Sequence, residues 1–582
     1  MSFTIFGICA FTYRKVSIMK KAQIFAMYYQ RYAILKLVPI SLILPSLKDK
    51  HLSVMQQKIQ IQVPPIIAFN EQLLKEEVKQ FLNVKDETLF VKPLRRSIDA
   101  RNRNIKVNLT LNVFVDEPLV TDEIHFDYKD VSKSKTTCHI VGAGPAGLFA
   151  ALRCLELNIK PIIIERGKNV KDRRRDLAAI NKDHIVNPES NYCFGEGGAG
   201  TYSDGKLYTR SSKRGSIEKI LNTFVYHGAS SEILVDAHPH IGTNKLPQLI
   251  ENIRETILKF GGEIHFNSKM VDLKIENGAI KEICVEAENG KAEFSIQSLI
   301  LATGHSARDI YELFDSKKIL IEAKPFAMGV RVEHPQELID SVQYHCNSAN
   351  EVNEKRDYLP AASYSLVNQI GAYSVYSFCM CPGGIIAPCA TGPEQVVTNG
   401  WSPSKRNNPY ANSGIVIGLT LNDFKPFSKH GELAGLEFQK ELEKSAWLAG
   451  GKTQTAPAQR LQDFVNGKLS SSLPDCSYVP GLKSVDMMSV LGNLIGKNLQ
   501  LGFKEFGKKM RNYLTNDALI VGVESRTSTP VRIPRDNQTL QHPHINNLFP
   551  CGEGAGYAGG IVSAAMDGER CADKVLELNN KP

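Results

Sequence analysis

The segment Cys138-His-Ile-Val-Gly142-Ala-Gly144-Pro-Ala-Gly147 decides the fold of this 582-residue chain. It predicts a strand, a glycine turn and the start of a helix. Gly142 allows the tight turn, Gly144 lets the backbone approach a pyrophosphate, and Gly147 lets the helix pack closely on the strand. Phosphates would then lie at the helix N-terminus, where free N–H groups and the helix dipole favour negative charge.

A second predicted strand ends at an acidic residue in the position that such a site requires. The run Pro161-Ile-Ile-Ile-Glu165 places Glu165 23 residues after Gly142, where a carboxylate can accept hydrogen bonds from ribose hydroxyls. Residues 148–155 carry leucines at helical spacing between the two strands. A glycine turn in another kind of βα unit is the alternative, but the combined pattern favours a dinucleotide site.

The C-terminal region contains a second glycine-rich element. Here Cys551-Gly552-Glu553-Gly-Ala-Gly-Tyr-Ala-Gly559-Gly560-Ile561 follows a short apolar run and leads into a helix. The chain resembles the two-dinucleotide-binding-domain flavoproteins, whose glutathione-reductase-like FAD domain closes a Gly-Glu element over an extended FAD. The resemblance implies that Glu553 binds a ribityl hydroxyl and that the helix at Gly559-Gly560-Ile561 stabilises the anionic reduced flavin. Residues 298–304 match the strand and turn that pass near the nucleotide in that family.

The resemblance extends from about Met55 to the C-terminus and narrows to a family of bacterial FAD-dependent dehydrogenases, or NAD(P)/FAD-dependent oxidoreductases, of undefined substrate. The segments that carry it are 95–101, 191–207, 376–384, 411–414 and 522–532. It implies FAD as the cofactor and leaves the reaction open. The cofactor-binding residues expected from the motifs and the resemblance are Gly142, Gly144, Pro145, Ala146, Gly147, Glu165, Arg166, Gly198, Ser203, Lys206, Val271, Ala302, Thr303, Gly304, Gly552, Glu553, Gly559, Gly560 and Ile561.

The predicted fold class is α/β. We expect a Rossmann-like FAD-binding domain of the ββα type, discontinuous in sequence over residues 135–309 and 516–582, with an inserted α+β substrate or cap domain at 310–515. Alternating apolar residues and a helical pattern at 71–82 predict a small ferredoxin-like α+β module at 55–130. Its basic segment 92–103 could bind RNA or phosphate, but it lacks interleaved aromatic residues, which favours a solvated or domain-docking loop.

Residues 1–54 form a basic leader. They contain eight lysines and arginines and one acidic residue, so they carry +7 of the net charge of +9 and leave about +2 for the rest. Their apolar run is interrupted by Lys36, Pro39 and Pro45 and is shorter than the roughly 20 residues of a spanning helix. Secretory and mitochondrial signals fit less well than a leader that is disordered or lies upstream of a true start at Met55.

Candidate catalytic residues are few, because flavin chemistry chiefly needs orientation, an acid or base and a positive group. The candidates are Arg526, His305, His334, Cys379 and Cys381. Arg526 and Arg532 could hold an anionic substrate or form ion pairs with Glu524 or Asp536, and each histidine could serve a structural role instead. Cys379-Met-Cys381 could exchange electrons with the flavin, although a disulfide with this spacing closes a strained ring. We expect no metal site.

The residues leave the electron donor open. The chain shows no second βαβ nucleotide unit, so we expect either an organic substrate or NAD(P)H docking transiently at the flavin. The expected function is an FAD-dependent oxidoreductase, dehydrogenase-like, that transfers hydride between flavin and one of these. The alternative is a flavoprotein with an RNA-modification or partner-binding role, docked through its N-terminal module. We expect a small-molecule substrate, no nucleic-acid partner and no membrane span, and the sparse cysteines predict a cytoplasmic location.

Overall fold

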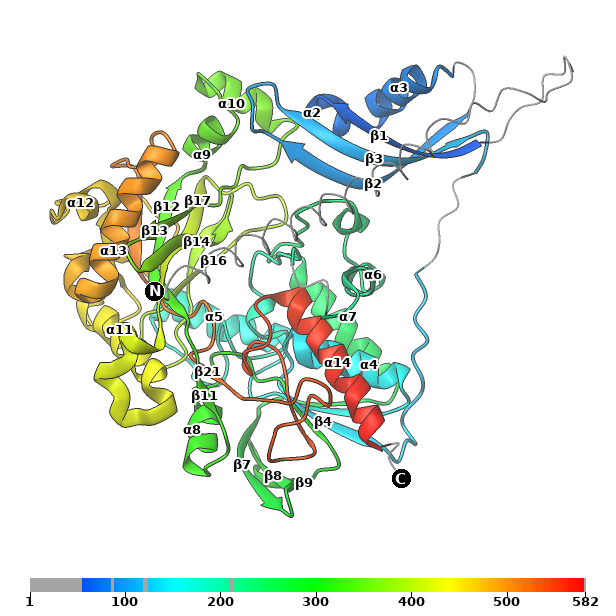
Figure 1. Ribbon diagram of the computed structural model, residues 1–582, viewed down its shortest axis with the longest axis vertical. Helices are drawn as coiled ribbons and strands as arrows, with labels where there is room; N and C mark the ends of the chain where they lie inside the picture. The colour runs from blue at the N-terminus through cyan, green and yellow to red at the C-terminus, as the bar shows by residue number, and fades with distance from the viewer. Residues whose placement is uncertain (1–54, 85–87, 119–123, 210–213, 580–582) are drawn as a thin grey trace, which may run out of the picture. The chain divides into compact units, whose positions relative to one another are not determined.

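The computed structural model describes residues 55–84, 88–118, 124–209 and 214–579 (Figure 1). The predicted basic leader, residues 1–54, lies outside the described residues. Among the described residues, no helix combines the length and the apolar character needed to cross a membrane.

The predicted FAD-binding fold is present as a parallel five-stranded sheet. Its strands, in order across the sheet, are β22 (Leu548–Pro550), β10 (Leu299–Leu301), β4 (Thr137–Val141), β5 (Lys160–Ile164) and β6 (Glu263–His265). An antiparallel sheet follows it, made of β7 (Ser268–Glu276), β8 (Ala279–Ala287) and β9 (Gly290–Ser295). The helices of this domain are α4 (Pro145–Glu156), α5 (Val170–Asp183), η1 (Gly198–Gly200), α6 (Ile217–Tyr226), η3 (Ser231–Leu234), α7 (Leu246–Lys259), α8 (Arg308–Ser316) and α14 (Ile561–Asn579).

Glycines set the close packing of α4 against the elements around it. A Cβ on Gly147 would lie 1.9 Å from the carbonyl oxygen of Gly142, so the helix can pack on the turn only with glycine there. A Cβ on Gly568 of α14 would lie 2.0 Å from the carbonyl oxygen of Ala146. The two helices therefore run side by side at close approach, as Figure 1 shows, although more than 400 residues of chain separate the end of α4 at Glu156 from the start of α14 at Ile561.

The second domain contains a seven-stranded sheet. Its order is β13 (Val367–Ile370), β14 (Tyr373–Cys381), β17 (Tyr410–Gly418), β12 (Ala327–Pro335), β20 (Leu519–Glu524), β18 (Ala456–Arg460) and β19 (Leu482–Ser484). Two small antiparallel pairs accompany it: β15 (Ile385–Pro388) with β16 (Thr398–Trp401), and β11 (Glu322–Ala323) with β21 (Val531–Arg532). The helices are α9 (Gln336–Gln343), α10 (Ala349–Arg356), η4 (Leu421–Leu433), α11 (Ala434–Gly450), α12 (Leu461–Asn466) and α13 (Met487–Lys509).

The chain enters and leaves this second domain at the β11–β21 pair, which shifts the predicted boundaries at 310 and 515. α8 packs on β7 of the FAD domain, whereas β20 pairs antiparallel with both β12 and β18. The apolar run of β20 suits the interior of either sheet, so the sequence pattern alone did not reveal which sheet it joins.

The N-terminal module has the order β1 (Met55–Val63), α2 (Pro65–Ala68), α3 (Glu71–Leu82), β2 (Leu89–Asp99) and β3 (Lys106–Val115). The three strands form an antiparallel sheet in the order β1-β3-β2, an α+β arrangement. A full ferredoxin-like fold has a second long helix and a fourth strand, and the described residues of the module contain neither. The basic segment predicted as a loop lies largely in β2, where ladder hydrogen bonds to β3 outweigh its charge.

Candidate functional site

A cavity of about 400 Å³ lies at the carboxyl ends of β4, β5 and β10. Ligands of open α/β sheets bind at this edge. The predicted cofactor residues that line it are Gly142, Gly144, Pro145, Ala146, Glu165, Arg166, Gly198, Ser203, Lys206, Ala302, Thr303, Gly304, Gly552, Glu553, Gly559, Gly560 and Ile561. The second domain contributes further lining residues, among them Phe378, Cys379, Asn399, Arg526 and Thr527. The cavity is therefore shared by the two domains.

The glycine turn has the geometry of a pyrophosphate cradle. Gly142 has φ +105°, and a Cβ there would lie 2.4 Å from the carbonyl oxygen of Ala302. A Cβ on Gly144, in contrast, would meet only the Cα of Gly198, at 3.9 Å, so this position is open towards the cavity. No side chain of the described residues caps α4, which leaves its first N–H groups for a ligand. The turn therefore fits the phosphates of FAD.

Gly147 and Val271 are the two predicted cofactor residues that do not line the cavity. Gly147 serves the packing of α4 on the turn instead. On β7 the residues Ser268, Lys269 and Met270 line the cavity, and Val271 follows them directly. The expected contact of Val271 with the adenine of FAD, through backbone groups of this strand, stays a prediction.

Glu165 anchors the loops around the cavity. Its carboxylate accepts hydrogen bonds from the backbone N–H groups of Ala143, Gly167 and Gly195, at 2.8, 2.9 and 2.9 Å. A carboxylate offers about four acceptor positions, so one remains for a ribose hydroxyl. The adjacent Arg166 stacks over the ring of Phe194, with its guanidinium carbon 4.2 Å from the ring centroid.

Glu553 faces the cavity next to His305, with Oε2 3.7 Å from the histidine Nε2. Burial, with a contribution from Cys379, raises the pKa of Glu553 to about 7. Burial, together with the charges of Arg526 and Arg308, lowers the pKa of His305 to about 4. At neutral pH the histidine is therefore uncharged, and Glu553 can hold or release a proton.

Arg526 lines the cavity but has a different ion-pair partner from those expected. It binds Glu443 of α11 through Nε and Nη2, each 3.0 Å from a carboxylate oxygen, whereas Glu524 pairs with Arg331 at 2.8 Å. Arg308 reaches the same Glu443 carboxylate at 2.7 Å. Although burial opposes it, these two guanidinium groups hold the pKa of Glu443 at about 2. The trio carries one net positive charge beside the cavity.

Two further candidates lie away from the site. His334 is fully buried in β12, and its Nε2 lies 2.9 Å from the carbonyl oxygen of Tyr513. Burial lowers its pKa to about 4, which is typical of a structural histidine rather than a catalytic one. Arg532 lies outside the cavity lining, where its side chain is partly exposed and 4.0 Å from Glu322.

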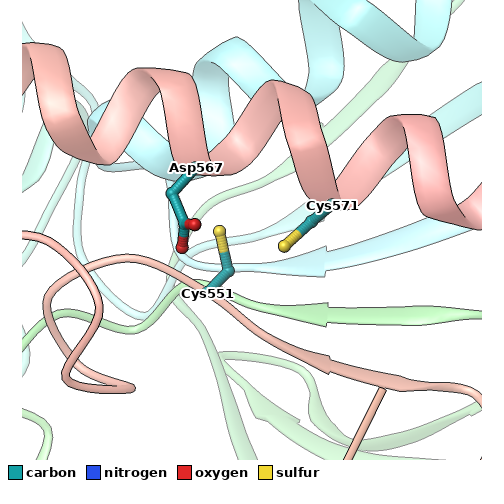
Figure 2. Close-up of side chains that lie close together, drawn as sticks. All are labelled: Cys551, Asp567 and Cys571. Atoms are coloured by element: carbon teal, nitrogen blue, oxygen red, sulfur yellow. The ribbon is translucent and has the colours of Figure 1, made fainter. Parts of the chain in front are cut away.

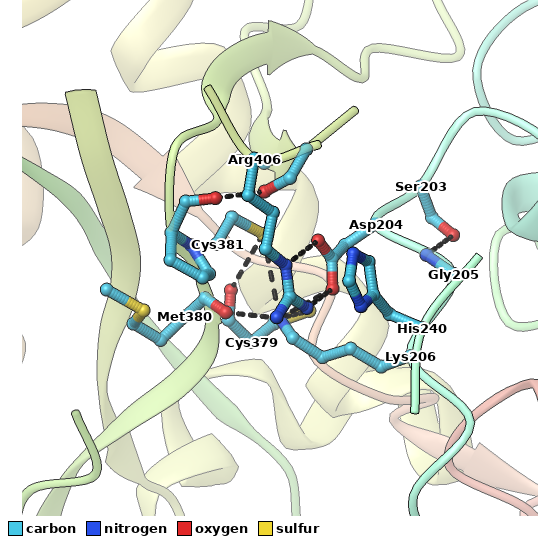
Figure 3. A network of polar contacts seen from close by, with 12 residues as sticks. Ser203, Asp204, Gly205, Lys206, His240, Cys379, Met380, Cys381 and Arg406 are labelled. Carbon is cyan, nitrogen blue, oxygen red and sulfur yellow. Dashed lines mark hydrogen bonds and ion pairs between the residues drawn. The ribbon is translucent and has the colours of Figure 1, made fainter. Parts of the chain in front are cut away.

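The two candidate cysteines of β14 differ in their surroundings. Cys379 is exposed in the cavity, whereas Cys381 is buried behind it. Both sulfurs lie close to the Nζ of Lys206, which comes from the FAD domain (Figure 3). The structure therefore brings together a predicted cofactor residue and two predicted redox residues that are separated by more than 170 positions.

Sequence reasoning missed several residues of the site. Asn399 and Phe378 line the cavity from the second domain, Tyr208 lines it from the loop after η1, and Glu443 holds Arg526. None of them lies in a motif with a known spacing. Only Phe378, within the segment 376–384 that resembles the family, carried a signal that could have found it.

A cluster of Cys551, Asp567 and Cys571 lies behind the Gly552-Glu553 turn (Figure 2), with ligand atoms within 4.8 Å of one another. Arg535 already binds both oxygens of the Asp567 carboxylate, at 2.9 and 2.6 Å, and the N–H of Gly552 donates to Asp567 at 2.9 Å. A metal ion would have to displace a guanidinium of the same charge sign. The cluster therefore fits a structural role, tying the turn to α14.

The fold and the cavity define a flavoprotein with a glutathione-reductase-like FAD domain. The family model described as "FAD-dependent protein, C-terminal domain-like" matches residues 325–527, and a model for a domain of unknown function matches residues 55–114. A protein of Clostridium beijerinckii, described as uncharacterized, is 38% identical over 532 residues, which cover 88% of this chain and 97% of that protein. The chain belongs to the family of this relative, and the family model that it matches describes an FAD-dependent protein.

Solved flavoprotein structures show a distant likeness in fold. The flavin-dependent brominase Bmp2 is 11% identical, with 77% of this chain and 80% of that chain covered and a TM-score of 0.34. The open conformation of a flavocytochrome c3 fumarate reductase is 12% identical, with 80% of this chain and 84% of that chain covered and a TM-score of 0.31. The glycine oxidase of Bacillus cereus is 11% identical, with 77% of this chain and 96% of that chain covered and a TM-score of 0.29. Nothing about the reaction follows from likeness at this level.

Proposed function

We propose that FAD occupies the cavity and that the protein is a dehydrogenase-like oxidoreductase, which exchanges hydride with an organic substrate held between the FAD domain and the second domain. The observation that supports this most directly is the shared cavity. The glycine turn and the N-terminus of α14 line one part of it, and Phe378, Asn399 and Arg526 of the second domain line another. Bound FAD would supply a two-electron redox centre there.

In this proposal the FAD domain binds and orients the cofactor. Gly144 and the uncapped N-terminus of α4 hold the pyrophosphate, and the free acceptor position of Glu165 takes a ribose hydroxyl. Glu553 takes a ribityl hydroxyl. The N-terminus of α14 at Ile561 and the ammonium of Lys206 favour negative charge on the reduced isoalloxazine.

The second domain supplies the positive group that a substrate would meet. The described contacts of Arg526, to Glu443, Thr391 and Gln395, use four of its five N–H groups and fix its orientation. The remaining N–H, on Nη1, has no partner among the described residues, and Arg526 lines the cavity. With the net positive charge of the trio, Arg526 is suited to orient an anionic substrate. Glu553 Oε2 and His305 Nε2 are the atoms that can hold or move a proton beside it.

Anaerobic spectroscopy of the purified yellow protein tests the proposal. The protein is mixed separately with NADH, with NADPH and with a pooled metabolite extract, while the flavin absorbance at about 450 nm is followed. We expect the extract to bleach the flavin, and fractionation then identifies the donor. Bleaching by a nicotinamide alone would assign the donor role to NAD(P)H instead. A colourless protein that cannot be reconstituted with FAD would contradict the proposal.

A matched pair of arginine variants tests the role of the second domain. With the metabolite fraction that bleaches the flavin of the unaltered protein, Arg526→Gln should slow flavin reduction about 10- to 100-fold. The substrate loses its charged partner in this variant, while Glu443 keeps its ion pair with Arg308. Arg532→Gln, off the cavity, should leave the rate unchanged. Equal rates for the two variants would place the substrate elsewhere.

A further inference from the structure

Two cysteines of β14 lie at a break in the strand. The register of β14 against β17 shifts between Phe378 and Cys381, and Cys379 has φ +47°. Neighbouring side chains on one face of a regular strand have Cα atoms roughly 6.6 Å apart, near the upper limit of about 6.8 Å for a disulfide. The bulge breaks this spacing, and the Cys381 thiol donates a hydrogen bond to the carbonyl oxygen of Cys379 at 3.3 Å.

One ammonium group lies next to both sulfurs. Lys206 Nζ is 3.9 Å from the Cys379 sulfur and 3.7 Å from the Cys381 sulfur (Figure 3). The lysine is held in place by a hydrogen bond to the carbonyl oxygen of Met380 and by Asp204, whose carboxylate is 3.7 Å away. An ammonium in this position stabilises a thiolate, the reactive form of cysteine.

The charged groups around the two sulfurs carry one net positive charge, which favours one negative charge among them. The charged groups are the cations Lys206, Arg331 and Arg406 and the anions Asp204 and Glu524. Burial lowers the pKa of His240, so this side chain is uncharged at neutral pH, whereas burial raises the pKa of Glu524 and of Glu553 to about 7, so each carboxyl is partly ionised there. With Asp204 and Glu524 ionised, the five charged groups carry one net positive charge. One thiolate would therefore neutralise the cluster.

The two thiols are differentiated by this environment. The neighbouring Cys381 thiol, followed by the charges of Lys206 and Arg331, lowers the pKa of Cys379 against the effect of burial. The neighbouring Cys379, together with burial, raises the pKa of Cys381. With the Lys206 ammonium beside both sulfurs, this environment favours the thiolate at Cys379, which is exposed in the cavity, and the protonated thiol at the buried Cys381.

We propose that Cys379 and Cys381 form a redox-active dithiol that exchanges an electron pair with the flavin. This inference rests on the proposed function, because it needs FAD in the cavity. In the oxidative direction the Cys379 thiolate and the Cys381 thiol form a disulfide and release two electrons and one proton. Bound FAD would supply the two-electron acceptor, to which both electrons and the proton would pass. The reverse reaction reduces the disulfide.

Reductive titration of the air-oxidised, FAD-bound protein under anaerobic conditions tests this inference. We expect uptake of four electrons per flavin, two by the flavin and two by the disulfide, and two electrons for Cys379→Ser or Cys381→Ser. Cys193→Ser is the matched control, because Cys193 also lines the cavity but its described contact is to the carbonyl oxygen of Cys389. This variant should still take up four electrons.

Alkylation followed by peptide mapping provides a readout that does not depend on turnover. When the protein is alkylated in denaturant, which exposes the buried Cys381, both Cys379 and Cys381 should be protected in the oxidised protein and labelled after reduction. In the reduced protein, Lys206→Met should move the pH midpoint of Cys379 alkylation upwards by about one unit or more, and Lys206→Arg should restore it in part.

The outcomes separate the two proposals. A protein that binds FAD but takes up only two electrons, with both cysteines alkylated before reduction, would overturn the dithiol and leave the proposed function intact. A protein that binds no FAD would overturn both. If the serine variants fold poorly, the titration and the mapping of the unaltered protein still decide the question.

Discussion

At the residue scale, two glycines of one motif have different tasks. A methyl group on Gly144 meets only a van der Waals contact at 3.9 Å, whereas one on Gly147 would lie 1.9 Å from a carbonyl oxygen. Gly144→Ala should therefore fold normally and bind FAD at least about tenfold more weakly, because the methyl group occupies the position of the pyrophosphate.

Gly147→Ala is the contrasting variant. It should lower the free energy of unfolding of the FAD-free protein by about 2 kcal/mol or more, since α4 must move off the turn. Urea unfolding and FAD titration of both variants check this. Equal loss of stability in the two would show that the motif acts on folding alone.

Glu553 should make the stability of the FAD-free protein depend on pH. Its pKa is raised from 4.5 to about 7, so the folded state binds the proton more tightly and stability falls as the pH rises from about 4.5 through 7. Glu553→Gln should remove about 1–2 kcal/mol of this fall, less than the full shift implies because the side chain is 30% exposed in the cavity.

Urea midpoints at pH 5 and pH 8 measure the effect. Glu577→Gln, an exposed position on the same helix α14, is the control and should leave the pH dependence as it is. A fall in stability of equal size in the Glu553→Gln protein would show that other groups cause it.

At the scale of elements, α14 holds the turn that carries Glu553. The Asp567 carboxylate of this helix binds Arg535 and the N–H of Gly552, and it is fully buried. Asp567→Asn would leave a buried guanidinium without a charged partner, so the free energy of unfolding should fall by about 3–5 kcal/mol. Chemical denaturation with and without FAD measures it.

Asp573→Asn on the same helix is the control for this variant. Its side chain is 43% exposed and pairs with Arg153, so the loss should stay below about 1 kcal/mol. If added zinc ions stabilised the unaltered protein and not Asp567→Asn, the cluster with Cys551 and Cys571 would be a metal site instead.

Elements with a clear period could be predicted closely. The helix expected at 71–82 is α3, because it presents an apolar stripe at helical spacing. The charged segment 92–103 was expected to be a loop and lies largely in β2. The apolar run of β20 was expected in the FAD domain and pairs with strands of the second domain. Their strand character depends on partners, β3 in one case and β12 and β18 in the other, that no local pattern identifies.

At the scale of the whole molecule, the N-terminal module is joined to the FAD domain by an ion pair. Arg96 of β2 binds Asp236 at 2.7 Å, with a side chain that is 14% exposed. Arg96→Ala should lower the melting temperature and make the module more sensitive to limited proteolysis, at a cost of about 1–2 kcal/mol. Arg95→Ala, at the exposed neighbouring position, should change neither.

This contact also bears on the basic segment of the module. An arginine that binds Asp236 and lies 3.6 Å from Glu232 is engaged within the protein. It serves domain docking, one of the two roles expected from the sequence. Loss of binding to an RNA probe in Arg96→Ala, with unchanged stability, would contradict this assignment.

The sequence by itself determined the class of protein, the FAD-domain fold and the positions of the glycine motifs. These follow from local chemistry, since turns, strand ends and helix starts depend on residues a few positions apart. Only the tertiary structure decided that Lys206 meets cysteines 173 and 175 positions away and that Arg526 meets Glu443 rather than its neighbour Glu524. Such contacts form where two separately folded sheets pack together, and the side chains that meet across that interface share no spacing along the chain.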